Sequence, residues 1–361
     1  LRRDRTVEVE LTEGGREYYQ GRAVIIATGA KPIKSRIPGI DLPGVWDSDR
    51  LLAAENWNFD RLVIMGGGVI AVEMATIFNN LCSRVTIVEK KNHLMAAMDD
   101  VMAEKLEQEL RDQGVEVYCG ATVTEIKEEG AGLCAVVTPE GEGESFEIHG
   151  CQILTAIGRR PDLSGLCGLD VTLETEDGKI AVSSEFETNI PGVYAIGDVS
   201  AAIQLAHVAA AQGTYVVERI AEKPHSIKLE VVPSGMFVAL PIVPSCIYTN
   251  PEIATVGITE AAAKKSGLKV RCGHCSMQDN GQSIISGEKR GFIRLVFEAY
   301  SGGIIGAQLM CPRATDMIGE IATAIANGLT AEQMSFAMRA QPTYNEGIGA
   351  AIEDAMRNEP R

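Results

Sequence analysis

The clearest pattern of hydrophobic and polar positions lies between residues 61 and 89. Arg61–Met65 is a short apolar run typical of a buried strand, and a turn of three glycines follows it. Val69–Asn80 has the composition and length of a helix, and Arg84–Glu89 returns to a strand. This order predicts one β-α-β unit with a parallel pair of strands.

Two β-rich stretches precede this unit. Thr6–Leu11 alternates polar and apolar residues, and Ala23–Ala27 is a continuous apolar run that predicts a buried strand. The segment Lys31–Gly44 is rich in turn residues, as expected where a chain crosses between domains.

The pattern after the central unit alternates helices and strands. Asp99–Gln113 has helical periodicity and stops before Gly114, a suitable C-terminal cap. Further strands are predicted over Val115–Cys119, in a meander over 121–157 with breaks at Glu129-Gly130 and Glu140-Gly141, over Val193–Ile196, and then over Ile242–Tyr248, Phe292–Phe297 and Gly303–Leu309. Helices are predicted over Ala201–Glu222, Ala314–Asn327 and Ala331–Met338, the last two completing a C-terminal α+β unit.

Charge and composition exclude some classes of function. A net charge of -16 disfavours nucleic acid as a partner, because phosphate backbones are bound by clustered Lys and Arg. The most apolar stretch, Val231–Tyr248, contains three prolines and does not suit a membrane helix. The sequence opens without an apolar signal segment, and its nine irregularly spaced cysteines suit a reducing compartment, so a cytoplasmic location is expected.

Gly66, Gly68 and Ala71 form a GxGxxA pattern between the predicted strand and helix. In this context Gly66 allows a tight turn, Gly68 lets the backbone approach a pyrophosphate, and Ala71 lets helix and strand pack closely. The helix opening at Val69 and Ile70, together with Gly67, offers backbone amides to the negative charge. The alternative, a glycine-rich turn of an ordinary α/β protein, does not explain the acid that ends the next strand.

That acid is Glu89, and it bears on the choice of nucleotide. A carboxylate accepts hydrogen bonds from a ribose but repels a 2′-phosphate by on the order of 4 kcal/mol at about 4 Å and an effective dielectric of about 20. NADH is therefore favoured over NADPH. Lys90 and Lys91 follow directly and soften this preference.

Several motifs, taken together, resemble the pyridine nucleotide-disulfide oxidoreductases, and most closely their dihydrolipoamide dehydrogenase branch. Five matches occur in order over nearly the whole chain: Ala27-Thr28-Gly29, Gly66–Glu73, Thr155–Pro161 with Gly158, Tyr194–Asp198 with the neighbouring Leu205-Ala206-His207, and Tyr248–Gly257.

The resemblance implies an α/β fold in which a Rossmann-like NAD-binding domain is inserted in a partial FAD-binding domain and is followed by an α+β dimerisation domain. The expected limits are a remnant of the FAD-binding domain over 1–45, the NAD-binding domain over 46–164, the second part of the FAD-binding domain over 165–239, and the dimerisation domain over 240–361.

The resemblance also implies the chemistry. In the family, electrons pass from a dihydrolipoyl dithiol to a CxxxxC disulfide, then to FAD and then to NAD. FAD contacts are expected at Thr28, Gly29, Gly197, Asp198, Ala206 and His207, with Gly158 at the end of the NAD domain and Glu73 near the flavin and nicotinamide. A homodimer is expected, with a lipoyl-bearing substrate or a 2-oxoacid dehydrogenase complex as partner.

Two departures from the family pattern change this picture. The first GxGxxG and the CxxxxC pair are absent, since no two of the nine cysteines lie five positions apart, and the sequence is expected to begin about 110 residues into the family pattern as a truncated piece. Gln341 stands where the family has a histidine that acts as general acid and base, while Glu346 is retained. A glutamine cannot titrate, so poor thiol-disulfide exchange is expected.

Alternatives remain beside this interpretation. The chain as it stands could be a non-catalytic NAD-binding and dimerising module, or part of a sister reductase with another substrate. Cys272-Gly273-His274-Cys275 has redox-motif spacing, but strand-like neighbours disfavour that use. His93 and His149 are interpreted as loop residues and no metal site is expected, while Met95 and Met98 are expected to fill packing gaps.

Overall fold

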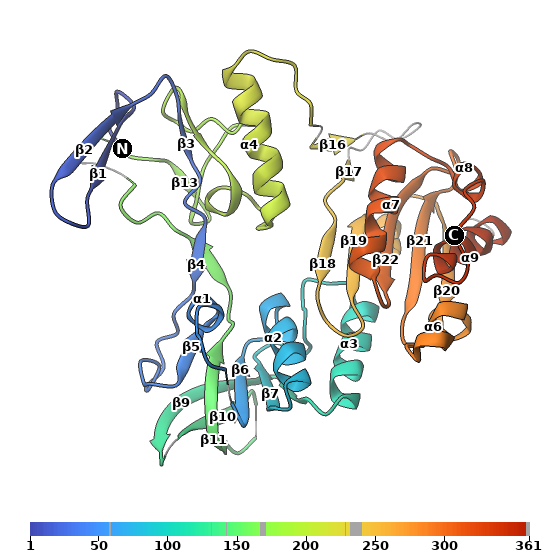
Figure 1. The fold of residues 1–361 in the computed structure, drawn as a ribbon, viewed down its shortest axis with the longest axis horizontal. Coiled ribbons are helices and arrows are strands. Elements are labelled where there is room, and N and C mark those ends of the chain that lie inside the picture. The colour runs from blue at the N-terminus through green and yellow to red at the C-terminus, as the bar shows by residue number, and fades with distance from the viewer. Residues whose placement is uncertain are drawn as a thin grey trace. The chain divides into compact units, whose positions relative to one another are not determined.

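A computed structural model describes residues 1–57, 59–130, 132–141, 143–166, 171–227, 229–231 and 240–358 (Figure 1). The chain separates into two compact units, one of residues 1–33 with 158–229 and one of residues 34–157 with 230–361. The four domain ranges drawn from the sequence stay a prediction. Much of the apolar stretch 231–248, residues 232–239, lies outside the described residues.

The first unit is built around a parallel pair of strands from opposite ends of its sequence. Val24–Ile26 (β3) pairs with Val193–Ala195 (β15), as the apolar runs predict. The predicted helix 201–222 is shorter than expected, because the chain stays non-helical until the N-cap Leu205. The remaining elements are β1 (Thr6–Glu10), β2 (Arg16–Gln20), β4 (Ala30–Pro32), β12 (Arg159–Pro161), β13 (Thr175–Glu176), β14 (Lys179–Ile180), the 3-10 turn η1 (Gly197–Val199) and α4 (Ala206–Ile220).

A seven-stranded sheet forms one half of the second unit. Its strand order is β8-β7-β6-β11-β10-β9, with β5 also paired to β11. The strands β5 to β8 and β11 pair in parallel, as the β-α-β prediction requires. The bounds are β5 (Val45–Asp47), β6 (Arg61–Met65), β7 (Arg84–Glu89), β8 (Glu116–Cys119), β9 (Ala121–Glu129), β10 (Gly132–Pro139) and β11 (Phe146–Thr155).

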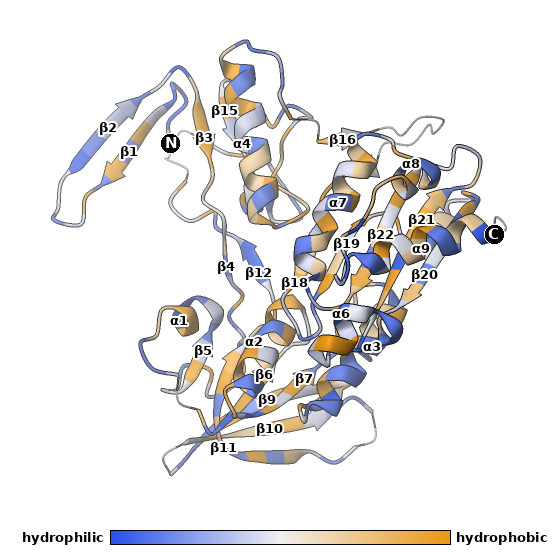
Figure 2. Cartoon of the chain, turned by 45° about the vertical axis from the view of Figure 1, so that its right-hand side comes forward, coloured by the Kyte–Doolittle hydropathy of each residue, from blue (hydrophilic) through white to orange (hydrophobic). Residues whose placement is uncertain are grey.

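Helices cover one face of the parallel strands of this sheet, and β9 and β10, at one end of the same sheet, pack against the other face. Leu62 and Ile64 of β6 pack in one core with α2 (Val69–Asn80) and α3 (Asp100–Asp112), while Val63 and Met65 pack in the other with β9 and β10. Both faces are buried, which explains why β6 is a continuous apolar run (Figure 2). The short helix α1 (Ser48–Leu52) precedes β6.

The other half of the second unit is a five-stranded antiparallel sheet in the order β18-β19-β22-β21-β20. α7 and α9 pack in one core against it, α7 over β19 and β22 and α9 over β20 and β21. The bounds are β16 (Glu230–Val231), β17 (Leu240–Pro241), β18 (Ser245–Ile247), β19 (Ile253–Gly257), α5 (Glu260–Lys265), β20 (Val270–Ser276), η2 (Met277–Asp279), α6 (Gly281–Ser286), β21 (Phe292–Glu298), β22 (Ile304–Met310), α7 (Ala314–Ala326), α8 (Ala331–Ser335) and α9 (Glu346–Arg357).

Three sequence expectations were wrong in this half. The predicted strand 242–248 shortens to β18, and the predicted helix 331–338 ends at Ser335. The expectation of two helices missed α5, α6 and above all α9, whose Ile348, Ala351 and Ile352 are fully buried. α9 contains two glycines, so its helical form depends on this packing more than on local propensity.

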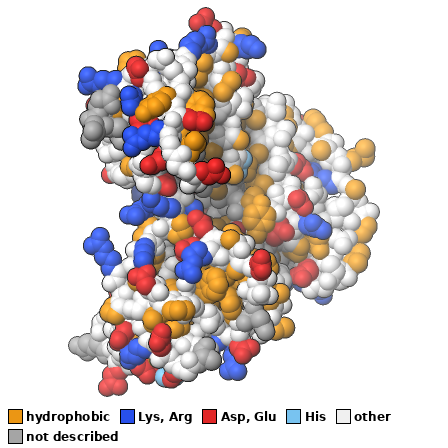
Figure 3. Space-filling model, turned by 60° about the vertical axis from the view of Figure 1, so that its left-hand side comes forward, with side chains coloured by type: hydrophobic (Ala, Val, Ile, Leu, Met, Phe, Trp, Pro, Cys, Tyr) orange, Lys and Arg blue, Asp and Glu red, His pale blue; other side chains and the backbone are white. Residues whose placement is uncertain are grey.

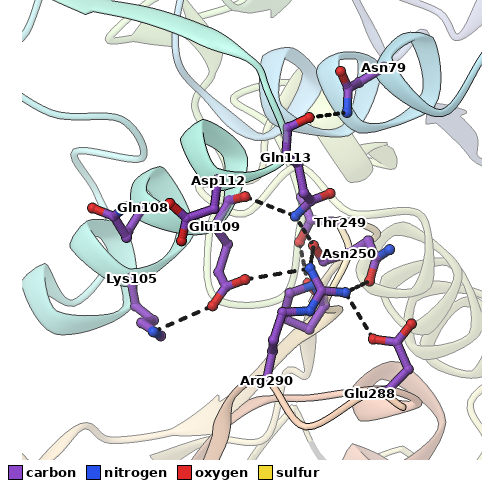
Figure 4. A network of polar contacts seen from close by, with 11 residues as sticks. Asn79, Lys105, Gln108, Glu109, Asp112, Gln113, Thr249, Asn250, Glu288 and Arg290 are labelled. Atoms are coloured by element: carbon purple, nitrogen blue, oxygen red, sulfur yellow. Dashed lines mark hydrogen bonds and ion pairs between the residues drawn. The ribbon is translucent and has the colours of Figure 1, made fainter. Parts of the chain in front are cut away.

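A polar network joins the two halves of the second unit (Figure 4). Gln113, just after α3, donates from Nε2 to the backbone oxygen of Asn250 at 2.7 Å. Arg290 Nη2 donates to Asn250 Oδ1 at 2.8 Å, and its Nη1 lies 3.5 Å from the buried carboxylate of Glu109. These contacts fix the segment that follows β18 against the end of α3.

Among the described residues no helix combines the length and apolar character that a membrane crossing requires. On the face drawn in Figure 3, acidic and basic side chains are interspersed.

Candidate nucleotide and flavin sites

The turn between β6 and α2 is held by backbone contacts on both sides. Gly66 donates from its amide to the carbonyl of Val88 at 2.8 Å and has φ +107°, a conformation that other residues rarely adopt. A Cβ at Gly66 would lie 2.5 Å from the backbone oxygen of Ala156. This position therefore requires glycine, as the GxGxxA pattern predicts.

The start of α2 is open to a ligand. Gly68 is the N-cap residue, no described side chain caps the helix, and no described atom lies within 4 Å of a Cβ built at Gly68. Val69 is 40% exposed and Ile70 is half-buried, whereas Ala71 is fully buried against the sheet. Uncapped amides beside free space fit the pyrophosphate of a dinucleotide.

Glu89 ends β7 beside this turn and is held by two backbone amides. One carboxylate oxygen accepts a hydrogen bond from Gly67, and the other accepts one from Lys91 at 2.7 Å. A carboxylate has about four acceptor positions, so each oxygen keeps one for a ribose hydroxyl. These remaining acceptor positions fit the hydroxyls of an adenosine ribose without a 2′-phosphate.

Glu73 lies on α2, one turn beyond the glycines. Its carboxylate is half-buried and accepts a hydrogen bond from the backbone amide of Tyr248 at 2.9 Å. Burial raises the pKa of Glu73, and the hydrogen bond from Tyr248 partly opposes this. Glu73 is thus tied to the segment after β18, a contact that no signal in the sequence indicated.

In the first unit, two predicted flavin motifs come together. β3 and β15 are parallel neighbours, and the amide of Ile196 donates to Ile26 at 3.0 Å. Thr28-Gly29 and Gly197-Asp198 therefore leave the same carboxyl edge of the pair, where α/β folds bind ligands. Thr28 Oγ1 donates to the backbone oxygen of Asp162 at 2.8 Å, which fixes the first loop.

Asp198 has the properties expected of a ligand-binding acid. It lies half-buried in η1, and among the residues that the structure describes its carboxylate has no hydrogen-bond or ion-pair partner. Gln212 of α4 accepts from the amide of Gly197 at 2.8 Å and so fixes the turn. Ala206 and His207 are exposed in the first turn of α4, which no described side chain caps. This arrangement fits the ribityl and ring portions of a flavin.

Gly158 lies where the chain enters the first unit from β11. Its backbone oxygen accepts from Ile33 at 3.0 Å, and the strands β12 and β4 that follow and precede these residues are paired. The structure thus places Gly158 beside Ile33 within this unit.

The segment 339–346 is held by hydrogen bonds of both its backbone and its side chains, among them those of Arg339 and Asn345 to Glu320. Thr343 donates from its amide to Glu346 at 2.9 Å, and its carbonyl accepts from Asn280 at 3.0 Å. Glu346 is the first residue of α9. Gln341 is exposed, and in the described ranges its side chain has no hydrogen-bond partner. Beside this segment lies a cavity of about 370 Å³ lined by Glu320, Asn345 and residues of α7.

The CxxC pattern occupies a strand. Cys272 and Cys275 lie on β20, where residues three apart face opposite sides, and they pack in different cores. Burial raises the pKa of Cys272 to about 12, and that of Cys275 is raised as well. Neither thiol is activated for redox chemistry.

Met95 is buried and Met98 packs against the same core, as expected.

His149 does not lie in a loop as expected. It is on β11, because the strand begins at Phe146 and continues to Thr155. Its ring contacts Glu129 at 2.9 Å. His93 does lie outside helices and strands, with Nδ1 2.8 Å from the carbonyl of Leu94.

Comparisons with known sequences agree with this geometry. Residues 1–213 match the family model "Pyridine nucleotide-disulphide oxidoreductase", and residues 243–352 match that family's dimerisation domain. The chain is 33% identical to dihydrolipoyl dehydrogenase from Chlorobaculum tepidum, covering 98% of the chain and 72% of the relative. It is 34% identical to dihydrolipoyl dehydrogenase from Thermus scotoductus, covering 93% and 70%.

Solved structures show the same fold. LpdA from Mycobacterium tuberculosis superimposes with a TM-score of 0.83 at 25% identity, covering 96% of the chain and 72% of LpdA. The HOCl-induced flavoprotein disulfide reductase RclA from Escherichia coli has a TM-score of 0.84 at 23% identity, covering 97% of the chain and 76% of RclA. Members of the matched family use FAD and NAD. The chain therefore belongs to the pyridine nucleotide-disulfide oxidoreductases, as an oxidoreductase of the dihydrolipoyl dehydrogenase type.

Proposed function

We propose that the β6–α2 turn binds NADH and that the carboxyl edge of β3 and β15 binds FAD. The reaction is electron transfer between NAD and a lipoyl dithiol. When bound, the two cofactors carry the electron pair between dithiol and nicotinamide. The chain's own residues position them: the amides after Gly68 hold the pyrophosphate, Glu89 accepts from the ribose, and Asp198 accepts from the flavin side chain.

The observation that carries the proposal is the pairing of Glu89 with the glycine turn. Glu89 is fixed by amides from Gly67 and Lys91 next to an uncapped helix start. A carboxylate held in this way accepts hydrogen bonds from the neutral ribose hydroxyls of NADH and repels the 2′-phosphate of NADPH. This arrangement supports NADH over NADPH.

Glu73 is proposed to lie near the reacting rings. Its carboxylate is held by Tyr248, and its raised pKa makes it easier to protonate than an exposed glutamate. Gly158 and Thr28-Gly29 are proposed to shape the backbone beside the bound cofactors.

Gln341 sets the limit of the proposed activity. An exposed amide hydrogen-bonds to a thiol or disulfide but cannot remove and return its proton. Thiol-disulfide exchange is proposed to be slow, by about the 10²- to 10⁴-fold that an acid-base group contributes. Glu346 is retained at the start of α9, so the scaffold for a histidine is present.

The dimerisation domain supports a homodimer, in which Gln341 and Glu346 are proposed to complete the partner's site. The proposed partner is a lipoyl-bearing protein such as a component of a 2-oxoacid dehydrogenase complex, in the cytoplasm.

We also propose that the domains divide at residues 45, 164 and 239. This division follows from the order of the family's motifs along the chain.

The test is calorimetric titration of the folded chain with NADH and, as the matched ligand, NADPH. NADH is expected to bind at least about tenfold more tightly, which corresponds to about 1.4 kcal/mol. Absence of heat with millimolar NADH in a chain with native circular dichroism would contradict the proposal.

A second candidate is a non-catalytic NAD-binding and dimerising module. It is favoured by the cysteine spacing, since no two of the nine cysteines lie five positions apart. An absorbance spectrum after incubation with FAD separates the candidates. A retained flavin band supports the flavoenzyme, whereas NADH binding without flavin retention supports the module.

A further inference from the structure

Three side chains of metal-ligand type meet on the outer face of the seven-stranded sheet. Glu129 ends β9, Cys134 lies near the start of β10, and His149 lies in the first half of β11. Their ligand atoms all lie within 4.8 Å of one another. The Nδ1 atom of His149 is 2.9 and 3.0 Å from the two carboxylate oxygens of Glu129.

Strand pairing with a bulge creates this cluster. On β10, Leu133 pairs with Cys151 and Ala135 pairs with Ile148, so the single residue Cys134 lies opposite two residues of β11, one of which is His149. Such a bulge changes the direction in which a side chain points. Leu133 and Ala135 face the core, and Cys134 therefore faces the opposite side.

The thiol of Cys134 is buried without a partner. Cys134 is 3% exposed, and within the described part of the chain no hydrogen bond reaches its sulfur. The groups around it are charged: Glu129 and Lys127 on β9, and Glu147 and His149 on β11. A small apolar residue would fill this position equally well, so packing alone does not account for a thiol beneath a carboxylate and an imidazole.

The donor set matches a borderline-soft divalent cation. Thiolate sulfur, imidazole nitrogen and carboxylate oxygen are the three ligand types of Zn²⁺ in proteins, and spacings under 4.8 Å suit a single ion. The thiolate and the carboxylate together balance the ion's two charges. The nearby ammonium of Lys127 is already paired with Glu147 at 2.8 Å, which reduces its repulsion of a cation.

We propose that Glu129, Cys134 and His149 bind Zn²⁺, with water as the fourth ligand. Binding replaces the proton of the Cys134 thiol by a sulfur–zinc bond and releases that proton to solvent. The ion joins β9, β10 and β11, and so clamps the meander that covers one face of the nucleotide-binding sheet.

The site lies away from the proposed nucleotide turn. His149 is near the amino end of β11, where its carbonyl accepts from Arg61 at the start of β6, whereas the glycine turn follows the carboxyl end of β6. The two proposals therefore fail independently. NADH binding to a variant that has lost the metal site also serves as a check of its fold.

The experiment titrates the full metal-free chain with Co²⁺, which has a visible spectrum that Zn²⁺ lacks, and then displaces it with Zn²⁺. The parent is expected to develop a thiolate-to-cobalt absorption band at one equivalent, and Zn²⁺ is expected to remove it. Cys134→Ser is expected to abolish the band and His149→Ala to weaken binding at least tenfold. The matched controls, Cys82→Ser on an exposed cysteine and His93→Ala, are expected to behave as the parent does.

Two outcomes of the cobalt titration overturn the proposal: no thiolate band in the parent at millimolar Co²⁺, or a band that survives Cys134→Ser. Thermal unfolding gives a second readout. Zn²⁺ is expected to raise the Tm of the parent and of Cys82→Ser, but not that of Cys134→Ser. An equal rise in all three proteins places the ion elsewhere and also refutes the site.

Discussion

The glycine turn after β6 and the segment 339–346 are both short stretches that lead into a helix, but they are held in different ways. At the turn the backbone itself is confined, with Gly66 against Ala156 and Glu89 against Gly67. In the second segment the backbone is held by a few polar contacts, and the side chain of Gln341 extends into solvent. A substitution in the first region changes shape, whereas one in the second changes chemistry.

The largest effect is expected at Gly66. Gly66→Ala places a Cβ 2.5 Å from a backbone oxygen at a positive φ, a strain of order 1–3 kcal/mol or more, and is expected to abolish NADH binding and lower the Tm. Gly68→Ala meets no described atom within 4 Å and should keep the parent Tm while losing NADH affinity. Calorimetry with thermal unfolding measures both. If Gly68→Ala binds NADH as the parent does, no pyrophosphate lies at this turn.

The next largest effect is expected at Gln341. With the chain joined to the N-terminal flavin segment of a dihydrolipoyl dehydrogenase that carries the CxxxxC pair, Gln341→His is expected to raise dihydrolipoamide oxidation by about 10²-fold or more. Gln341→Asn, which also cannot titrate, is the control and should leave the rate low. NADH affinity should be equal in all three. Equal rates for the parent and the Gln341→His variant would show that proton transfer does not depend on this position.

A smaller change is expected at Glu89. Glu89→Gln keeps an oxygen for the amide of Gly67 but removes the charge that repels a 2′-phosphate. The ratio of NADPH to NADH affinity is expected to rise about tenfold, less than full Coulomb repulsion gives because the site is half-exposed. Glu104→Gln, on an exposed position of α3, is the control. An unchanged ratio would mean that Glu89 does not contact the ribose.

The smallest effect is expected from Glu73. Because burial raises its folded-state pKa, the carboxyl contributes most favourably below its unfolded pKa, and that contribution is lost as the pH rises through the folded pKa. Glu73→Gln removes this dependence, so the stability of the variant relative to the parent should increase from about pH 4 to about pH 8. Urea unfolding at both pH values measures it. A relative gain at low pH instead would reverse the sign and contradict the burial of this group.

The same two regions show what a sequence can predict. α2 was predicted to the residue because its signals are local: an apolar strand, three glycines and a helical run. α9 was missed because its glycines lower helix propensity, and its burial on β20 depends on close approach at Gly273, where a Cβ would lie 1.8 Å from the backbone oxygen of Ala351. That contact joins residues far apart in sequence.

The candidate sites follow the same rule. The candidate site residues Gly66 to Ile70 and Glu89 could be predicted from the sequence because a single motif contains all of them. The contacts of Glu73 with Tyr248 and of Thr343 with Asn280 join distant segments, and no spacing in the sequence encodes them. The cluster of Glu129, Cys134 and His149 was hidden for this reason, since only strand register brings these residues together.

The network around Arg290 has a consequence for anyone who divides this chain into pieces. Cutting near residue 240 would remove Asn250 and Arg290 from α3 and leave the carboxylate of Glu109 facing a newly exposed surface. Ile247 and Ile253, which pack in the same core as α2 and α3, would leave with them. A nucleotide-binding fragment made in this way would expose an apolar surface and would aggregate. The sheet that contains β6 and the sheet that contains β19 are therefore best produced as one polypeptide.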